Sequence, residues 1–551
     1  MSRVAREASS ADVSPCPSGG PQTGEVDNLR LLRENFLKAS ECVSEQYQRS
    51  AEVFSLHMII QNFINGEWKK GEEEKTFDSI NPADTSEVVG VVAGSTRRDV
   101  DSAVEAARGA FRSWRLLPAP RRGEILFRAA ELLTKRKREL GEIMTREMGK
   151  VLPEALGDVQ EAIDMAYYMA GEGRRLGGET IPSELPDKDC KSVRVPLGVC
   201  GLITPWNFPL AIPAWKIMPA LVSGNTLVFK PSSYVAVCAA KLVEIMDEAG
   251  LPPGVLNLIN GRGEEAGEYL ASHRGIDALS FTGSTAVGLQ LARTCAEQGK
   301  KVSCEMGGKN AIIVMDDARL EIAVEGAVWG GFGTTGQRCT AASRVVVHEA
   351  VYDRFIAMFS RAALGLKVGN GLDPSAAVGP LINEAQREKV LGYIETGKRE
   401  GARLITGGKA CVSGDCAKGC FVEPTIFADV QPGMRIAREE IFGPVVSVLR
   451  AKDLADAIAI VNDTDYGLVS AIYTQDVNAS ARAERDLDTG IVYINASTIG
   501  AEIQLPFGGA KRSGYGHKEA GGRGGALDMF TRWKVIYRDY SGRLQKAQID
   551  R

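Results

Sequence analysis

Apolar positions in the first third of the chain recur at the spacing of an amphipathic helix. Between residues 99 and about 176 they return every three to four positions, as Val100, Ala103 and Val104 illustrate. Similar runs extend from 121 to 147 and from about 154 to 171. The pattern therefore predicts a series of long helices, each with one buried face.

From Val199 onward the pattern changes to short apolar runs that alternate with helical stretches. The predicted strands span 199–204, 225–229, 255–259 and 276–281, and the predicted helices span 212–222, 235–249, 263–271 and 286–295. This alternation is typical of βαβ units around a parallel sheet that is covered on both faces. A second alternating block runs from 311 to about 492. We expect ligands at the carboxyl ends of such strands.

Three shorter features predict strands that pair locally or at an edge. Asn65-Gly66 lies between two apolar runs and predicts a two-residue hairpin turn. A hairpin near 181–195 and a tail strand near 533–537 predict a small arm whose edges are open to pairing with another subunit. Between Pro506 and that last strand, the tail is predicted to form a helix.

Composition narrows the class of protein. A chain of 551 residues is long enough for two or three domains, and 44% hydrophobic with 25% charged residues is the balance of a globular protein. With a net charge of −4, the chain lacks the excess of positive charge that is typical of proteins that bind nucleic acid or an anionic membrane. No apolar run approaches the ~20 residues that cross a bilayer. Eleven scattered cysteines suggest no disulfide framework and favour a reducing, cytoplasmic setting.

Two segments depart from the regular pattern. Residues 1–57 include a stretch rich in Ser, Pro and Gly and a weak helix candidate at 28–44, so we expect a disordered extension, with Met58 as an alternative start. The segment 410–421 carries three cysteines without the paired C-x2-C spacing of zinc sites. It predicts a surface hairpin, and we expect no metal in the protein.

A single cysteine in a glycine-rich stretch is the first candidate for chemistry. Cys339 follows Arg338 within the stretch 331–343, and a neighbouring cation favours the nucleophilic thiolate. The glycines let backbone N–H groups approach whatever the sulfur attacks. Since most cysteines are small buried hydrophobes, the interpretation depends on what else the chain offers.

Polar residues follow several of the predicted strands. Asn207 suits an amide donor to an oxyanion, Lys230 a hydrogen bond to ribose or phosphate, and Glu305 a general base. Each also has an ordinary interpretation as a turn residue or a solvated side chain. The stretch 283–288 opens a helix whose N-terminus can hold pyrophosphate, although it lacks the lysine of a P-loop and the third glycine of a dinucleotide fingerprint.

Seven motifs in one order change this picture. They are PWNFP at 205–209, FKPS at 229–232, FTGSTAVG at 281–288, EMGGKN at 305–310, GQRC at 336–339, EEIFGPV at 439–445 and PFGG at 506–509. Together they resemble the aldehyde dehydrogenase superfamily over about residues 58–540. The resemblance implies an α/β fold with a Rossmann-type cofactor domain at 58–177 and 197–306 and an α/β catalytic domain at 307–516. A small β oligomerisation arm with the tail would comprise 178–196 and 517–540.

The resemblance also implies NAD(P)-dependent oxidation of an aldehyde to a carboxylic acid. Cys339 would attack the aldehyde carbon, the Asn207 amide would hold the oxyanion, and Glu305 would activate water to hydrolyse the thioester. Lys216 matches a lysine near the site. The implied cofactor residues are Ile203, Thr204, Pro205, Trp206, Lys230, Ser233, Gly283, Ser284, Gly307, Glu440 and Phe442. Because Ser233 stands where many NAD-preferring members carry a glutamate, the cofactor is NAD or NADP.

For the substrate, the resemblance implies a set of residues around the cysteine. They are Phe208, Trp215, Arg338, Thr340, Gly500, Ala501 and Phe507. The loop 498–503 is similar to that of α-aminoadipic semialdehyde dehydrogenases (the antiquitin group), where an arginine and a Gly-Ala pair hold an α-carboxylate. Asp158 or Glu161 would meet an α-amino group. Combined with LPFGG at 505–509, the loop looks more like 2-oxoglutarate semialdehyde dehydrogenases, with glutamate semialdehyde and broad-range detoxification as alternatives.

The expected partners are a small-molecule aldehyde and further copies of this chain, as a homodimer or homotetramer. Nucleic acid and membranes are not expected partners. One rival within enzymes transfers the acyl group to coenzyme A, and Glu305 argues against it because a positioned base serves hydrolysis. The other rival is a homologue without catalysis, which would have lost the cysteine or the base.

Overall fold

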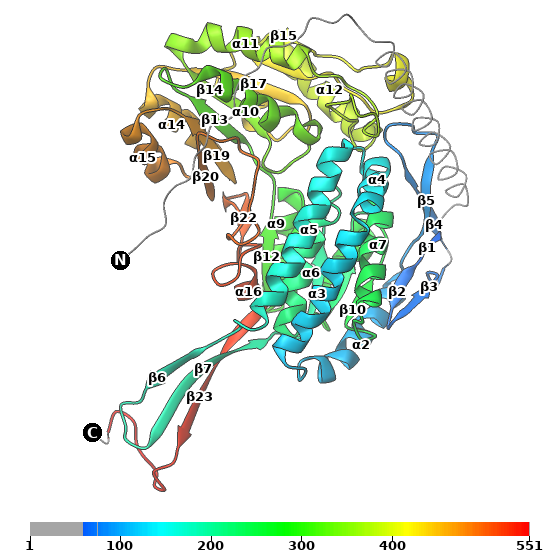
Figure 1. Ribbon diagram of the computed structural model, residues 1–551, viewed down its shortest axis with the longest axis vertical. Coiled ribbons are helices and arrows are strands. Elements are labelled where there is room, and N and C mark those ends of the chain that lie inside the picture. Colours follow the sequence, from blue (N-terminus) through cyan, green and yellow to red (C-terminus); the bar gives the residue numbers. More distant parts are fainter. Residues whose placement is uncertain (1–58, 74, 550–551) are drawn as a thin grey trace, which may run out of the picture. The chain divides into compact units, whose positions relative to one another are not determined.

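The computed structural model describes residues 59–73 and 75–549. This part of the chain forms two large sheets with helices packed against them and three smaller sheets, as the ribbon in Figure 1 shows. The α/β fold predicted from the alternating pattern is confirmed. The predicted helix at 28–44 and the alternative start at Met58 lie outside the described residues.

The first large sheet has eight strands, of which the five central ones are parallel. In spatial order the strands are β22 (Gly514–Tyr515), β12 (Lys301–Glu305), β11 (Ala278–Thr282), β8 (Val199–Ile203), β9 (Thr226–Lys230), β10 (Leu256–Leu258), β2 (Asn62–Ile64) and β3 (Glu67–Lys69). All residues of β8, β9 and β11 are buried, as expected for strands covered on both faces. β2 and β3 form the predicted hairpin, with Asn65 and Gly66 at positive φ.

Helices between residues 97 and 297 pack against this sheet and against one another. They are α2 (Arg97–Trp114), α3 (Ala119–Lys135), α4 (Lys137–Met148), α5 (Leu152–Glu172), α6 (Ala211–Ser223), α7 (Ala236–Glu248), α8 (Glu268–Ser272) and α9 (Thr285–Glu297). α5 packs against α3, α4 and α6, next to which it is drawn in Figure 1. The single run predicted over 121–147 is two helices, because the backbone leaves helical geometry at Arg136.

The second large sheet has seven strands that are parallel except for one edge pair. Their spatial order is β15 (Arg403–Thr406), β16 (Thr425–Ala428), β17 (Val445–Ala451), β14 (Ala342–His348), β13 (Asn310–Val314), β19 (Val469–Tyr473) and β20 (Ile491–Ile494). The accompanying helices are α10 (Leu320–Phe332), α11 (Tyr352–Leu364), α12 (Glu384–Arg399), α13 (Arg435–Arg438), α14 (Leu454–Asn462) and α15 (Val477–Asp486).

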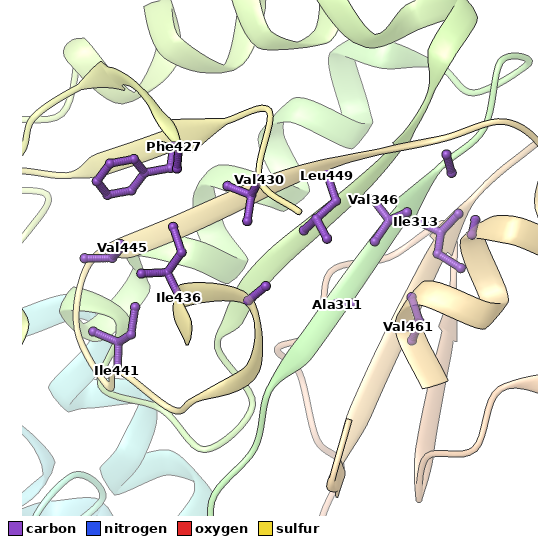
Figure 2. Packing of buried hydrophobic residues seen from close by; sticks show 14 of the residues in the cluster. Ala311, Ile313, Val346, Phe427, Val430, Ile436, Ile441, Val445, Leu449 and Val461 are labelled. Atoms are coloured by element: carbon purple, nitrogen blue, oxygen red, sulfur yellow. The ribbon is translucent and has the colours of Figure 1, made fainter. Parts of the chain in front are cut away.

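Alternate residues of these strands pack into two cores on opposite faces of the sheet. Ala311 and Ile313 of β13 join one core, which Figure 2 shows together with Val346 and Leu449 of the neighbouring strands. Ile312, between them in sequence, belongs to the other core. This period of two is the geometry of a strand covered on both sides, so the sheet is a rigid base for the loops at its ends.

The predicted arm is a three-stranded antiparallel sheet of β6 (Glu179–Pro182), β7 (Lys188–Pro196) and β23 (Thr531–Asp539). β7 lies in the middle, and the labelled strands run together in Figure 1. The pairing of the hairpin with the tail strand is thus confirmed. The helix predicted in the tail is only one turn, α16 (Ala526–Met529), because the chain before it forms β21 (Ala510–Lys511), β22 and then turns and bends over 516–525.

Smaller elements complete the described chain. A three-stranded sheet contains β1 (Ile59–Ile60), β5 (Val88–Ala93) and β4 (Thr76–Ile80), and β18 (Tyr466–Gly467) pairs with β21. The predicted cysteine hairpin is closed by an antiparallel bridge between Ala410 and Val422, although Cys416 and Cys420 are buried within it. Among the described residues, no His, Cys, Asp or Glu group of three or more is arranged to hold a metal ion. No helix there is long and apolar enough to cross a membrane. The domain boundaries at 177, 197, 307 and 517 stay a prediction.

Candidate active site

The carboxyl ends of β8 and β9 meet where the sequence predicts a cofactor. Ile203 is the last residue of β8, and the Thr204 amide donates to the Lys230 carbonyl at 3.3 Å. The Oγ1 atom of Thr204 is buried and has no hydrogen-bond partner among the described residues. Pro205 follows at once, and Trp206 meets Phe442 edge to face at 5.4 Å. A buried hydroxyl without a partner at a strand end is a position where a polar ligand group fits.

Lys230 ends β9 with its side chain buried. Its ammonium donates to the Pro231 carbonyl at 2.8 Å, and burial lowers its pKa to about 8. Ser233 opens a short turn capped by the Ser232 side chain. No carboxylate stands at position 233, so the charge that would repel a 2′-phosphate is absent there.

Glycines follow the next two strands at positions where neighbouring side chains leave no room for a Cβ. A Cβ at Gly283 would collide with the Phe281 ring, and one at Gly307 with the Glu440 carboxylate. Glu440 accepts a hydrogen bond from the Gly308 amide at 2.9 Å, and burial raises its pKa. Ser284 is the exposed residue that precedes the 13-residue helix α9, whose N-terminus favours an anion.

The predicted cofactor residues therefore lie at neighbouring strand ends of the first sheet, with Glu440 and Phe442 reaching them from the second. The orphaned hydroxyl, the buried amine and the open helix N-terminus fit a dinucleotide that carries ribose hydroxyls and pyrophosphate.

A cavity of about 660 Å³ brings the predicted chemistry together. Its lining includes Cys339 and Glu305. It also includes every predicted substrate residue, which are Phe208, Trp215, Arg338, Thr340, Gly500, Ala501 and Phe507. Residues from Val151 to Glu519 thus share one site, and most of its wall is apolar.

Cys339 lies at this wall and is partly exposed to the cavity. Burial raises the pKa of its thiol to about 12, and Glu440, Glu305 and Glu519 add to the shift, whereas the Thr340 amide opposes it. Burial and these three carboxylates outweigh whatever favours the thiolate. The guanidinium of Arg338 is directed to other partners, and its expected effect on the thiolate stays a prediction.

Those partners lie on the segment before Cys339 and on α5. The Arg338 Nε donates to the Thr334 Oγ1 at 2.8 Å, and Nη2 lies 3.7 Å from a Glu154 oxygen. The guanidinium also stacks over the rings of Trp329 and Phe208, at 4.9 and 5.2 Å from their centroids. Only 9% of the side chain is exposed. Arg338 is thus held in a fixed position at the wall of the cavity.

The Asn207 side chain contacts the backbone of the segment that leads to Cys339. The Asn207 Nδ2 donates to the Gln337 carbonyl at 3.1 Å, and Gln337 is in turn fixed by the Ile382 amide, which donates to its Oε1 at 2.9 Å. One of the two Asn207 amide hydrogens is used in this bond, and the second is free to donate elsewhere.

Glu305 is the last residue of β12 and is buried. The Gly509 amide donates to its Oε2 at 3.1 Å, and Gly508, at φ +154°, has no room for a side chain because a Cβ would collide with the carboxylate. Burial raises the pKa of Glu305 well above its usual range, and the neighbouring Glu519 raises it further, against Lys518 and Lys216. A carboxylate whose pKa is raised is a stronger base than an ordinary one, which suits a general base.

Lys216 is fully buried, and its main partner was missed by the sequence analysis. Its ammonium donates to the Ser280 Oγ at 2.8 Å and forms an ion pair with Glu519, which also accepts from the Thr282 Oγ1 at 2.8 Å. Glu519 reaches this position because Phe507 and Glu519 exchange backbone hydrogen bonds of 2.7 Å. No local sequence pattern predicts a contact between two residues that lie 303 positions apart.

The two acids suggested for an α-amino group differ in the structure. Asp158 is engaged on both oxygens, by the Lys150 ammonium at 2.9 Å and the Ala211 amide at 2.7 Å. Glu161 lines the cavity and makes no hydrogen bond within the described residues. Burial, together with the nearby Asp158, raises the pKa of Glu161 to about 7. Glu161 is therefore the available acid, and Asp158 is not.

Comparisons with known proteins agree with this site. The family model described as "Aldehyde dehydrogenase family" matches residues 68–536. The alpha-ketoglutaric semialdehyde dehydrogenase of Bacillus subtilis (strain 168) is 44% identical over 476 residues, covering 86% of this chain and 97% of the relative. The alpha-ketoglutarate semialdehyde dehydrogenase of Haloferax volcanii is 44% identical over 480 residues, covering 87% and 99%.

A similar solved structure is the betaine aldehyde dehydrogenase of Staphylococcus aureus in complex with NAD+. It superposes with a TM-score of 0.87 at 35% identity, covering 90% of this chain and 98% of that one. The family match spans most of the chain, and the relatives are matched over nearly their whole length. The chain therefore belongs to the aldehyde dehydrogenase family and is an NAD(P)-dependent enzyme that oxidises an aldehyde to a carboxylic acid.

Proposed function

We propose that the substrate is a semialdehyde that carries a carboxylate, specifically 2-oxoglutarate semialdehyde (2,5-dioxopentanoate). The observation that carries this proposal is Arg338, a buried guanidinium on the wall of the cavity that holds Cys339. A guanidinium binds a carboxylate through two parallel hydrogen bonds. Gly500 and Ala501 line the same cavity and offer backbone groups for the same end of the substrate. Relatives that are 44% identical are named for this aldehyde.

Cys339 is the proposed nucleophile. The thiol loses its proton to water in the cavity, and the resulting thiolate sulfur forms a bond to the aldehyde carbon, which converts the carbonyl oxygen into an oxyanion. The Asn207 amide hydrogen that is not bonded to Gln337, together with the Cys339 backbone N–H, would stabilise that oxyanion. One donor of this kind contributes about 3 kcal/mol to the transition state.

A nicotinamide cofactor bound at the strand ends would supply the acceptor for the hydride of the aldehyde carbon. Thr204, Lys230, Glu440 and the α9 N-terminus would hold the cofactor, with Trp206 and Phe442 packed beside it. The enzyme is left as a thioester on Cys339. Glu305 then takes a proton from the water that attacks this thioester, and the acid is released. Since Ser233 carries no negative charge, we propose that NADP is accepted beside NAD.

The carboxylate proposal predicts a substrate-dependent effect of Arg338→Gln. For 2-oxoglutarate semialdehyde, kcat/KM should fall about 10²-fold, because a buried hydrogen-bonded charge is worth roughly 1.5–3 kcal/mol. For butanal, which has no carboxylate, it should change less than about threefold. Initial rates with NAD and with NADP in parallel measure both. An equal loss for both aldehydes, or wild-type preference for alkanals, would contradict the proposal.

Glu161 favours a second candidate, an amino-acid semialdehyde. Glu161 makes no hydrogen bond within the described residues and lines the same cavity as Arg338. The pair suits a substrate whose ammonium meets Glu161 and whose carboxylate meets Arg338. Including aminoadipate and glutamate semialdehydes in the same panel separates the candidates. If the amino-acid substrate is the true one, Glu161→Gln lowers its kcat/KM and spares the 2-oxo acid.

We infer that the arm joins two copies of this chain, as a dimer or a dimer of dimers. β23 is an edge strand of nine residues, and Trp533, Val535 and Tyr537 on it are 52–67% exposed. An exposed apolar edge of this length is suited to pairing with another subunit. Light scattering at micromolar concentration should give two or four times the mass of one chain, and a monomer would refute the inference.

We further propose a cytoplasmic location. Nine cysteines of the described residues are free thiols, as expected in a reducing compartment. Cell fractionation with activity staining would test it, and activity in a membrane or organelle fraction would contradict it.

A further inference from the structure

One face of α5 carries two acidic residues whose carboxylates accept hydrogen bonds from other segments of the chain. Glu154 and Asp158 are four residues apart, so they lie one above the other. Both line the cavity that holds Cys339. Neither serves as a cap of α5, whose first turn begins at Leu152. Their partners are two different loops of the active site.

Glu154 holds the loop that leads to Cys339. Its two oxygens accept from the Thr334 amide at 2.9 and 2.8 Å, and one of them also accepts from the Thr334 Oγ1 at 2.9 Å. Thr334 and the next residue, Thr335, have φ angles of +50° and +58°, which β-branched residues rarely adopt. Such a backbone persists only where its surroundings impose it. Glu154 supplies three of the contacts that do so.

The same contacts determine where Arg338 lies. Thr334 Oγ1 donates to Glu154 and accepts from the Arg338 Nε, so one hydroxyl joins the acid to the arginine. The carboxylate of Glu154 lies 3.7 Å from Arg338 Nη2. Glu154 therefore orients the Arg338 guanidinium through the Thr334 hydroxyl. It also supplies part of the negative charge beside that guanidinium.

Asp158 holds the loop that carries Asn207. One oxygen accepts from the Ala211 amide at the start of α6, and the other from the buried Lys150 ammonium. That ammonium lies 3.9 Å from the centroid of the Phe208 ring, the residue that follows Asn207. Asp158 thus fixes both ends of the segment between Asn207 and α6.

We propose that Glu154 and Asp158 are positioning residues, through which one face of α5 sets the cysteine loop and the asparagine loop relative to each other. The proposal rests on the roles given above to Cys339 and Asn207. Because both loops depend on one rigid helix, the sulfur and the amide donor keep their spacing when substrate enters. Displacement of a reacting group by about 1 Å can cost about 10²-fold in rate.

Glu154 gives the sharper test, since two variants separate its two effects. Glu154→Ala removes all the contacts to Thr334, and kcat should fall about 10²-fold for every aldehyde. In Glu154→Gln the amide oxygen still accepts from the loop, but the negative charge beside Arg338 is gone. KM for the carboxylate-bearing aldehyde should then fall about threefold, with KM for butanal unchanged. A general loss of stability cannot produce a tighter KM for one charged substrate alone.

Asp164→Asn is the matched control, because Asp164 is an exposed acid on the same helix, bonded only to Gln160 in the described part of the chain. It should leave kcat and both KM values unchanged. If Glu154→Ala does not fold, Thr334→Val replaces it, since it removes only the shared hydroxyl, and KM for the carboxylate-bearing aldehyde should rise. For Asp158, the paired variant Asp158→Asn with Lys150→Met avoids a lone buried charge and should lower kcat for all aldehydes, with KM unchanged.

Folded variants of Glu154→Ala and Asp158→Asn/Lys150→Met that keep kcat within threefold of the wild type would overturn the proposal. So would a rise in KM for both aldehydes in Glu154→Gln. Failure of the proposed substrate is distinguishable, because the wild type would then prefer another aldehyde while the loss of kcat in Glu154→Ala would still appear with it. Alkylation of Cys339 by iodoacetamide adds a readout without turnover, and its rate should change in Glu154→Ala but not in Asp164→Asn.

Discussion

Replacement of Cys339 by serine is expected to lower kcat/KM for every aldehyde by about 10⁴-fold or more, the loss seen when a covalent nucleophile is removed. The serine side chain is only slightly smaller than that of cysteine, and the substitution leaves the backbone N–H in place. The cavity and the cofactor residues should therefore be unchanged. A hydroxyl, however, ionises far less readily than a thiol, and the same burial and carboxylates that raise the pKa of the thiol to about 12 oppose its ionisation as well.

Stopped-flow measurement of NAD(P)H absorbance should show neither a burst nor a steady state in Cys339→Ser. Binding of NAD(P) itself, measured by calorimetry, should be retained. Cys190→Ser is the matched control, since Cys190 lies on β7 of the arm, away from the cavity lining. More than about 1% of wild-type activity in Cys339→Ser would assign the nucleophile elsewhere.

Glu305→Gln is expected to separate the two halves of the reaction. Glutamine keeps the shape and still accepts from the Gly509 amide, but it cannot take a proton from water. NAD(P)H should form in a single burst of about one equivalent per site, followed by a steady state about 10²–10⁴-fold slower. Mass spectrometry of the stalled enzyme should find the acyl group on Cys339.

The pH profile gives a second criterion. Because the pKa of Glu305 is raised, its base form accumulates only as pH increases through that raised value, so hydrolysis by the wild type should accelerate with pH there. Glu305→Gln should lose this dependence. Free acid should appear without coenzyme A in the wild type. A strict need for coenzyme A, or an unchanged steady state in Glu305→Gln, would exclude Glu305 as the hydrolytic base.

Motifs at strand ends were predictable from the sequence because their chemistry is local. Thr204-Pro205-Trp206 follow one strand, and Lys230 is the last residue of the next. In a parallel sheet such residues lie at the carboxyl edge, whatever the arrangement of the other elements. The substrate residues Arg338 and Gly500 were inferred from a loop similarity to one group of the family, and both line the cavity of Cys339. Periodicity likewise gave the helices and most strands, and its main errors were the break at Arg136 and the short tail helix.

Contacts that depend on packing were not predictable in this way. The side chain of Arg338 is next to Cys339 in sequence, yet its charge is directed to Glu154 and Thr334 rather than to the sulfur. Glu519 has no signature in its own segment, and it becomes part of the site only through the strand-like pairing with Phe507 and the ion pair with Lys216. Such contacts are properties of the folded chain, because each partner lies on a different element.

The return of the tail into the site has a consequence for the timing of synthesis. The Gly509 amide that bonds Glu305, the carboxylate of Glu519 and the arm strand β23 all belong to the last tenth of the chain. A ribosome has therefore made the nucleophile, the base and every strand of the two large sheets except β22 before the groups that contact Glu305 and Lys216 exist. A chain that ends between residues 340 and 518 therefore contains Cys339 but lacks the Glu519 carboxylate with which the buried Lys216 ammonium forms its ion pair.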